Sequence, residues 1–409
     1  MTTHPIQPVA IKSQAVNFQA LPPLSLYIHI PWCVRKCPYC DFNSHEVRVP
    51  TSPAKGEGKT QTLPEQEYVA ALIRDLEMAL PQVWGRKVYT VFFGGGTPSL
   101  LSGESVAEIL RNVRMLLPLD LGAEITLEAN PGTVEAARFA AYREAGVNRL
   151  SMGIQSFNDT HLQALGRIHS AAEAQRAIEI AQQHFDNLNL DLMYALPGQT
   201  LDEAMQDVKT ALSFAPQHLS CYHLTLEPNT LFYHNPPSLP DDDASSDMQQ
   251  HIEEMLAAAG YQHYETSAFA QPKRRARHNL NYWKFGDYLG IGAGAHSKLS
   301  FPGRIIRQAR YKQPQAYMQQ VGKGVPIQTE SEVSRDDLGF EFMMNALRLN
   351  EGFDSTQFGE RTSLSLLSIQ GELAEAEKRA LLIRDHQRIA PTLMGRRFLN
   401  DLLEIFLKR

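Results

Sequence analysis

The chain has 409 residues, enough for two or three domains, and a formal net charge of −6. This acidic balance does not favour nucleic acid as a partner. No apolar run is long enough to cross a bilayer, and residues 1–23 are polar and lack the compact apolar segment of a signal peptide. We therefore expect a flexible N-terminal arm over residues 1–23.

Short β-branched or aromatic runs alternate with helical patterns through the first half of the chain. The expected strands are 24–30, 88–93, 124–129, 149–154, 188–193 and 219–224. The expected helices are 65–80, 105–116, 134–144, 159–165, 171–183 and 201–214. This alternation predicts parallel strands joined by right-handed crossovers. Six such units indicate an α/β fold with a partial, laterally open (β/α)6 TIM-like barrel over residues 24–235.

The second half of the chain has a different pattern. A polar, Gly- and Pro-containing loop is expected at 51–64, and an α/β connecting region at 236–334 holds a helix at 244–259 that Asp241–Asp243 can cap. Helices at 336–349 and 364–383, a run at 387–393 and a final helix predict a small α-rich, winged-helix-like domain over 335–409. Because this domain has no clustered basic face, we interpret it as a packing module and not as a DNA-binding domain.

Three cysteines follow the first predicted strand: Cys33, Cys37 and Cys40, in the spacing C-x3-C-x2-C. Three thiolates on one tight loop can bind three irons of a cubane [4Fe–4S] cluster and leave the fourth iron open to a small molecule. A zinc site would need a second ligand pair, for which lone His45 is a weak candidate, and a disulfide framework would need more than four cysteines. We predict a cluster, and hence a cytoplasmic protein. Cys221, on the sixth strand, is expected to be a buried small side chain.

Polar residues and glycines follow the predicted strands, where the carboxyl ends of parallel strands meet. Singly, each is more often a cap or a buried hydrogen bond, and the Gly94–Gly96 run alone fits a tight turn as well as a close backbone approach to a ligand. Together they suit a zwitterionic ligand: the acidic side chains can bind its amino group and hydroxyls, and the Arg side chain can bind its carboxylate. The set is Gly95, Gly96, Thr97, Glu128, Gln155, Arg167 and Asp191.

Two further histidine motifs stand out. Tyr27 and His29 alternate with isoleucines, so both could face the barrel interior beside the cysteine loop, although His29 fits a satisfied core histidine equally well. A basic run at 273–277 precedes His278-Asn279-Leu-Asn-Tyr282-Trp283, and a Gly-rich stretch ends at His296. A basic run beside His and large aromatics could accept a flat dianionic ligand such as a porphyrin; a solvated loop beside core aromatics is an equal alternative.

These motifs resemble the radical S-adenosylmethionine (SAM) superfamily, in the branch of oxygen-independent coproporphyrinogen III dehydrogenase and the heme chaperones related to it. The resemblance runs from Leu24 to the C-terminus and rests on Tyr27-Ile-His-Ile-Pro31, the cysteine array, Gly-Gly-Gly-Thr-Pro-Ser and the strand-end residues. It implies that Cys33, Cys37 and Cys40 hold a [4Fe–4S] cluster whose open iron is chelated by SAM. The SAM pocket that it implies consists of Tyr27, Tyr39, Gly95, Gly96, Thr97, Glu128, Gln155, Arg167 and Asp191.

Departures from the dehydrogenase pattern favour the chaperones. Phe42 stands where the dehydrogenase has a further cysteine, and His296 stands where a hydrophobic residue touches a second SAM. The motif from His278 to Trp283 is a chaperone-type feature. The resemblance therefore implies heme binding by His278, Asn279, Tyr282, Trp283 and His296.

In function, the resemblance implies a heme chaperone without coproporphyrinogen dehydrogenase activity, which delivers heme to membrane hemoproteins such as respiratory enzymes. His278 or His296 is the candidate iron ligand, and cluster-driven homodimerisation is a further expectation. The alternative is the dehydrogenase itself, a radical enzyme of porphyrin biosynthesis that oxidatively decarboxylates propionates of coproporphyrinogen III.

Overall fold

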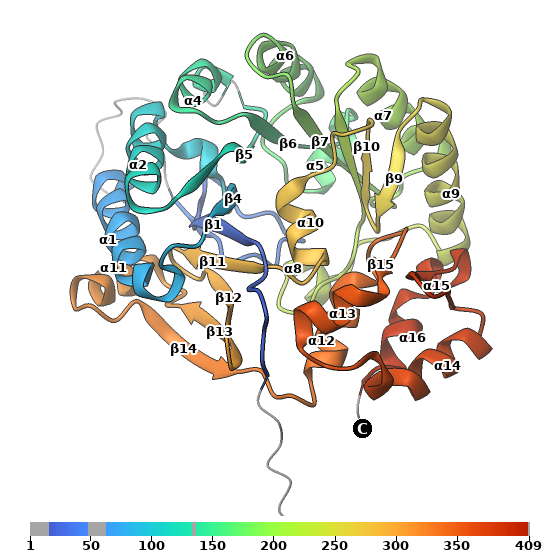
Figure 1. Cartoon of the computed structure of the whole chain (residues 1–409). Coiled ribbons are helices and arrows are strands. Elements are labelled where there is room, and N and C mark those ends of the chain that lie inside the picture. The colour runs from blue at the N-terminus through green and yellow to red at the C-terminus, as the bar shows by residue number, and fades with distance from the viewer. Residues whose placement is uncertain (1–15, 48–62, 133–135, 408–409) are drawn as a thin grey trace, which may run out of the picture.

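The computed structural model describes residues 16–47, 63–132 and 136–407. One mixed sheet of 12 strands dominates it, and its centre is six adjacent parallel strands (Figure 1). These strands are, in spatial order, β1 (Leu24–Ile30), β4 (Val88–Gly95), β5 (Leu119–Ala129), β6 (Arg149–Gln155), β7 (Leu188–Tyr194) and β8 (His218–His223). They match the six predicted strands, so the expectation of an open α/β barrel is confirmed.

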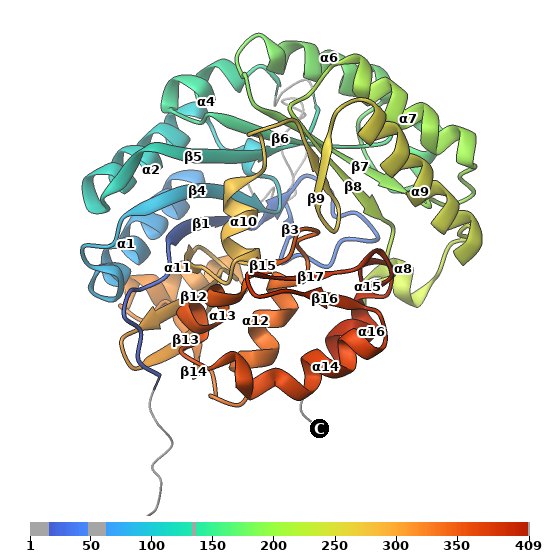
Figure 2. The same ribbon diagram turned by 45° about the vertical axis from the view of Figure 1, so that its right-hand side comes forward.

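Helices cover the outer side of the curved sheet (Figures 1 and 2). They are α1 (Glu65–Val83), α2 (Gly103–Leu116), α4 (Phe139–Ala145), α5 (Asp159–Ala164), α6 (Ala171–Gln182) and α7 (Leu201–Ser213). Capping boxes fix the starts of two of them: Ser170 pairs reciprocally with Glu173, and Thr200 with Glu203. The helix expected at 134–144 begins partly outside the described residues.

Both edges of the sheet come from the connecting region, which the sequence pattern did not predict. Beside β1 lie β11 (Asp287–Ile291), β12 (His296–Phe301), β13 (Arg304–Arg310) and β14 (Ile327–Glu332), of which β11 is parallel to β1 and the rest are antiparallel. Beside β8 lie β10 (Ala268–Ala270) and β9 (Gln262–Glu265). The region also forms α8 (Leu231–His234), α9 (Asp242–Ala258), which Asp241 caps as predicted, α10 (Arg277–Trp283) and α11 (Pro314–Gly322).

The C-terminal domain has its own hydrophobic core. Its helices are α12 (Leu338–Ala346), α13 (Ser355–Thr362), α14 (Gln370–Lys378), α15 (Leu393–Arg397) and α16 (Leu399–Glu404). Its small antiparallel sheet has the order β15 (Phe353–Asp354), β17 (Arg388–Pro391), β16 (Leu382–Arg384). The single helix expected at 364–383 was wrong: a short 3₁₀ turn precedes α14, and Ala380, with φ +56°, turns the chain out of α14 into β16.

Part of the expected N-terminal arm is packed against this domain. Residues 1–15 lie outside the described part, as does most of the loop expected at 51–64. Val16 and Phe18 are buried in the C-terminal core, and the Asn17 backbone N–H donates to Ser363 Oγ over 2.9 Å. The expectation of a free arm therefore fails from Val16 onward, because this segment carries apolar side chains that the second core buries. Among the described residues, no helix is long and apolar enough to cross a bilayer.

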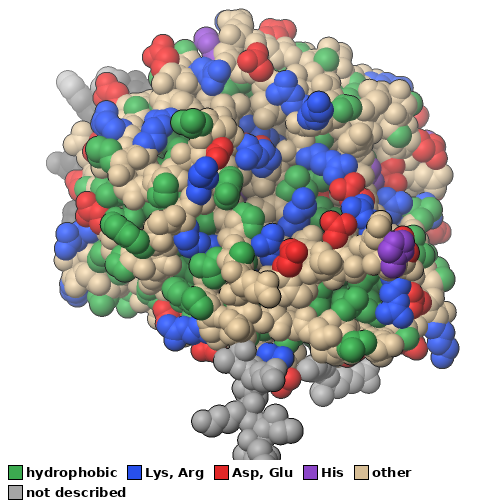
Figure 3. Space-filling view, viewed as in Figure 1, with side chains coloured by type: hydrophobic (Ala, Val, Ile, Leu, Met, Phe, Trp, Pro, Cys, Tyr) green, Lys and Arg blue, Asp and Glu red, His purple; other side chains and the backbone are tan. Residues whose placement is uncertain are grey.

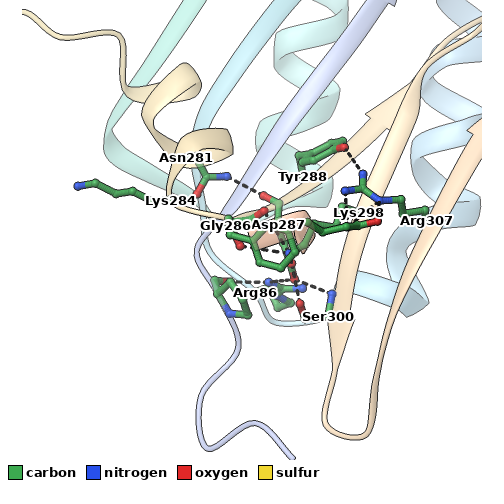
Figure 4. A network of polar contacts seen from close by, with 12 residues as sticks. Arg86, Asn281, Lys284, Gly286, Asp287, Tyr288, Lys298, Ser300 and Arg307 are labelled. Atoms are coloured by element: carbon green, nitrogen blue, oxygen red, sulfur yellow. Dashed lines mark hydrogen bonds and ion pairs between the residues drawn. The ribbon is translucent and has the colours of Figure 1, made fainter. Parts of the chain in front are cut away.

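A buried ionic network joins α10 to the sheet (Figure 4). Asp287 of β11 accepts from Arg86 Nη2 at 2.8 Å, from Lys298 Nζ at 3.0 Å and from Ser300 Oγ at 2.8 Å. Its main-chain oxygen accepts from Asn281 Nδ2 of α10 at 2.8 Å. Buried charges of this kind are stable only when they are paired and hydrogen-bonded. The network therefore fixes the position of α10 relative to the parallel strands.

Candidate functional site

A cavity of about 1230 Å³ occupies the interior of the barrel. Pockets for one small ligand usually measure about 300–1000 Å³, so this cavity has room for more than one. It is lined by strand ends, by the cysteine loop and by α10. Every residue that the sequence analysis selected for the cluster, for SAM or for heme lines it.

The cysteine loop forms one wall of the cavity. Cys33, Cys37 and Cys40 are free thiols, and no disulfide joins them. Burial raises the pKa of Cys33 and of Cys40, but Thr97 Oγ1 donates to Cys33 Sγ at 3.5 Å and so favours its thiolate. Arg167 Nη1 donates to Cys37 Sγ at 3.7 Å. Three unpaired thiols with charge-stabilising donors at one cavity wall fit the ligand set of a cluster.

A site for one metal ion is a poorer description of this wall. No three His, Cys, Asp or Glu side chains converge on a point for a single ion in the described residues. In a cubane each thiolate binds a separate iron, so the sulfur atoms surround the cluster and do not meet at one point. Cys221 is buried on β8, as predicted, with its pKa raised to about 12 by burial. His45 lines the cavity, and its Nε2 is buried without a hydrogen-bond partner.

His29 holds the cysteine loop against the sheet. Its Nε2 lies 2.9 Å from the main-chain oxygen of Asn43, and its Nδ1 lies 3.1 Å from Tyr27 Oη. Burial lowers its pKa to about 4, so the ring is neutral at pH 7. His29 thus lines the cavity and is also a satisfied core histidine. Gly95, with φ +113°, leaves the space that its ring needs, since a Cβ there would lie 2.5 Å from the imidazole.

Asn130 connects several residues of the site, although it is not among the site residues predicted from the sequence. Its Nδ2 donates to Thr97 Oγ1 at 3.0 Å, and its Oδ1 accepts from Arg167 Nη2 at 2.8 Å. The signal for it was present, because an Asn directly before Pro131 at a strand end indicates a non-helical loop. Arg167 also donates to the main-chain oxygen of Gly153 at 2.7 Å. The guanidinium is therefore oriented at the mouth of the barrel.

Two carboxyl groups lie inside the barrel. The pKa of Glu128 is raised to about 8 by burial and by the charge of Asp191, although Glu128 accepts from the Gly95 N–H at 3.3 Å. Burial also raises the pKa of Asp191, which accepts from Asn189 Nδ2 at 2.8 Å. Gln155, at the end of β6, has φ +69°, a left-handed conformation that is uncommon outside glycine and is frequent at functional sites. A cationic ligand would stabilise both carboxylates.

The motif on α10 does not lie at the carboxyl ends of the parallel strands. Its start is held by Glu124, whose carboxylate accepts from the backbone N–H of Arg277 at 3.2 Å and of His278 at 3.1 Å. Glu124 pairs in register with Thr90, and Thr90 with Ser25, near the amino ends of β4 and β1. Figures 1 and 2 show α10 on the concave side of the sheet. The helix therefore lies at the end of the cavity opposite the cysteines.

His278 and His296 have different surroundings. Both ring nitrogens of His278 are engaged, Nδ1 with Thr90 Oγ1 at 2.8 Å and Nε2 with Tyr282 Oη at 3.3 Å. The ring stacks on Phe92 with 4.8 Å between centroids, and burial lowers its pKa to about 3. His296, at the start of β12, is exposed to the cavity, and burial and the nearby charge of Lys312 lower its pKa. Asn279, Tyr282 and Trp283 complete this end of the cavity.

The basic run at 273–277 does not line the cavity, which agrees with the second of the two alternatives, a solvated loop beside core aromatics. Arg275 pairs with Glu351 at 2.7 Å, and Arg277 Nη1 donates to the main-chain oxygen of Gly122 at 2.6 Å. On the face seen in Figure 3, Lys and Arg side chains are mixed with acidic and hydrophobic ones. Among the described residues, the Lys and Arg side chains that line the cavity are Arg35, Lys36, Arg149, Arg167 and Lys312.

Comparison with known proteins agrees with this site. Residues 27–211 match the Radical SAM superfamily, and residues 333–398 match the HemN C-terminal domain. The heme chaperone HemW of Escherichia coli (strain K12) is 50% identical over 95% of this chain and 99% of its own length. The chain belongs to the HemW family of the radical SAM superfamily. The HemW of Haemophilus influenzae is 47% identical over 95% of this chain and 98% of its own length.

The fold also matches a solved relative. Coproporphyrinogen III oxidase (HemN) from Escherichia coli, described as a radical SAM enzyme, superposes with a TM-score of 0.78 at 25% identity, over 94% of this chain and 90% of that one. The two family matches and this superposition extend through the barrel and the C-terminal domain.

Proposed function

We propose that this protein is a heme chaperone of the HemW type, which acts in the cytoplasm, binds heme together with a [4Fe–4S] cluster and SAM, and delivers heme to membrane hemoproteins such as respiratory enzymes. The identity of 47–50% to heme chaperones over nearly the whole chain is the observation that carries the proposal. The single cavity that joins the cysteine loop to α10 supports it.

The carboxyl-end half of the cavity is the proposed cluster and SAM site. Cys33, Cys37 and Cys40 would hold the cluster, and Arg167 would bind the methionyl carboxylate. Glu128 and Asp191 would receive the cationic and hydroxyl groups of SAM, and Tyr39, Gln155 and the glycines would close the pocket. A reduced cluster held there would supply one electron for the reductive cleavage of the SAM sulfonium. The chain's own residues bind, orient and shield the cofactors from water.

The heme site is proposed between α10 and His296. Neutral imidazole suits heme iron, and His296 is exposed to the cavity whereas His278 has both nitrogens hydrogen-bonded. We therefore assign the axial ligand to His296 and a supporting role to His278, Asn279, Tyr282 and Trp283. The apolar faces of Phe92 and Trp283 would contact the macrocycle.

Separate alanine variants test this assignment. Hemin is titrated into the reconstituted wild type and into His296→Ala, His278→Ala and His386→Ala, the last an exposed histidine of the C-terminal domain that serves as control. His296→Ala should abolish the low-spin Soret signature, while His386→Ala should match the wild type. Unchanged heme spectra and affinity in both His278→Ala and His296→Ala would refute a histidine ligand from this site.

The superposition on coproporphyrinogen III oxidase makes a dehydrogenase the second candidate. Phe42 argues against it, since it is 60% exposed at the position where the dehydrogenase has a cysteine. Incubation with coproporphyrinogen III, SAM and a reductant without oxygen separates the two functions. The chaperone proposal predicts no protoporphyrinogen; turnover that Cys37→Ala abolishes would establish the enzyme. Size-exclusion chromatography before and after cluster assembly tests the further proposal of a cluster-driven homodimer.

A further inference from the structure

Arg149 is a buried cation with no anionic partner. It is the first residue of β6, its exposed fraction is 3%, and it lines the cavity. No ion pair or hydrogen bond of its guanidinium occurs within the described parts of the chain, and its Nε is enclosed without an acceptor. Burying an unpaired charge is costly, so this guanidinium is poised for an anion that enters the cavity.

The groups around Arg149 do not satisfy it. The charge of Arg149 acts on two carboxyl groups, Glu128 and Asp191, and on three further side chains, His278, His218 and Tyr264. Neither carboxyl group lies within 4.0 Å of the Arg149 guanidinium, the distance limit for an ion pair. Both accept hydrogen bonds from other groups: Glu128 from the Gly95 N–H, and Asp191 from Asn189 and Ser151. The other three groups are neutral.

Arg149 lies at the α10 end of the cavity. It pairs in register with Thr126 on β5, and it stands six positions before Gln155, where β6 reaches the mouth. Six strand residues span roughly 20 Å, since each contributes about 3.3 Å. The carboxylate of SAM, which Arg167 would hold near the cysteines, therefore pairs with a cation other than Arg149. Arg149 remains for a second anionic ligand beside α10.

We propose that Arg149 binds a carboxylate of the porphyrin ligand, one heme propionate, at the floor of the barrel beside His278. This inference rests on the proposed heme-binding function and adds the orientation of the ligand. Both propionates leave the same edge of the macrocycle, so this edge faces the floor of the barrel and the opposite edge faces the rim, where Lys312 lies near His296. The bidentate geometry of a guanidinium suits a carboxylate, and enclosure strengthens the contact.

Esterified heme separates carboxylate recognition from a structural role. The affinities of hemin and of hemin dimethyl ester are measured for the wild type, for Arg149→Met and for Lys312→Met, a matched removal of a rim cation. We expect Arg149→Met to weaken hemin binding by roughly 10-fold to 100-fold, the effect of one lost hydrogen-bonded charge contact, and to leave binding of the ester unchanged. Lys312→Met should lower hemin affinity less. Arg149→Lys, which keeps the charge, should retain part of the affinity.

Each outcome is decisive. Equal weakening of hemin and ester by Arg149→Met, or no weakening of either, would overturn the inference while the heme-binding function stands. If Arg149→Met loses SAM affinity but keeps its hemin affinity, the partner of Arg149 is the methionyl carboxylate of SAM, and the inference is again overturned. Failure of the wild type to bind hemin at all would refute the proposed function itself. If Arg149→Met does not fold, hemin and hemin dimethyl ester are compared on Arg149→Lys. Weaker binding of hemin alone supports the inference, and equal or no weakening of the two ligands overturns it.

Discussion

Arg167 donates a hydrogen bond to the sulfur of Cys37 over 3.7 Å, although the two residues are 130 positions apart in the sequence. The contact joins the loop after α5 to the cysteine loop after β1. The same guanidinium is oriented by Asn130 and by the main-chain oxygen of Gly153. One side chain therefore reaches both the proposed cluster ligand and the proposed SAM pocket.

Replacement of Arg167 should affect both cofactors. Arg167→Met removes a hydrogen bond to a cluster ligand, so the reduction potential of the reconstituted cluster should become more negative. It also removes a charged partner of the methionyl carboxylate, so SAM affinity should fall by about 10-fold or more. Spectroelectrochemistry and equilibrium dialysis measure the two effects. Arg176→Met, an exposed site on α6, serves as control, and an unchanged potential and affinity in Arg167→Met would contradict the assignment.

Glu128 should make the cofactor-free protein less stable at alkaline pH. Its pKa in the folded protein, about 8, lies above that of an ordinary glutamate, so the folded state holds this proton more tightly than the unfolded chain does. The free energy of unfolding should fall as pH rises from about 4.5 to about 8, by a few kcal/mol at most. Glu128→Gln should remove this fall in urea titrations, while Glu332→Gln, at an exposed site, should retain it. Parallel pH profiles for the wild type and Glu128→Gln would disprove the shift.

Gly95 should tolerate no side chain. Gly95→Ala places a Cβ 2.5 Å from the ring of His29, whereas Gly85, which also has a positive φ of +72°, has nothing within 4 Å. Both alanine variants carry backbone strain, so their difference isolates the steric conflict with His29. We expect Gly95→Ala to lose about 1–3 kcal/mol more stability than Gly85→Ala and to bind less iron on reconstitution. Equal losses would show that His29 does not depend on this glycine.

Asp287 should be a major source of stability. Burial alone would raise the pKa of Asp287, but Lys298 and Arg86 hold it below its usual range. Asp287→Asn leaves Lys298 as a buried, uncompensated charge and should cost about 3–5 kcal/mol in urea unfolding. The same network should weaken in acid, as pH falls through the lowered pKa of Asp287. Asp354→Asn, which breaks the exposed pair with Arg388, should cost less than about 1 kcal/mol.

The sequence was sufficient for the central barrel and for many, but not all, of the residues that line its cavity. Alternating strand and helix patterns located the six parallel strands, and parallel strands bring their carboxyl ends together whatever their spacing in the chain. The polar residues and glycines that follow the strands were therefore expected in one place, and they line one cavity: Gly95, Gly96, Thr97, Glu128, Gln155, Arg167 and Asp191.

Other features depended on contacts between distant segments. The strands β9–β14 do not alternate regularly with helices, so the pairing of β11 with β1 and of β10 with β8 had no local signal. The placement of α10 at the amino end depends on Glu124, and the partners of Arg275 and Arg277 lie elsewhere in the chain. Arg149 was missed because an arginine that begins a strand gives no sign in the sequence that it is buried without a partner.

The most direct test of the account is heme transfer. The protein is reconstituted without oxygen, loaded with one equivalent of heme, and mixed with the heme-free form of a respiratory b-type hemoprotein, while absorbance follows the acceptor's Soret band. If the protein is a heme chaperone, heme moves to the acceptor faster than it dissociates from the donor alone, and Cys37→Ala or His296→Ala slows the transfer. Transfer no faster than spontaneous dissociation, or heme that stays on the donor, would contradict a chaperone function.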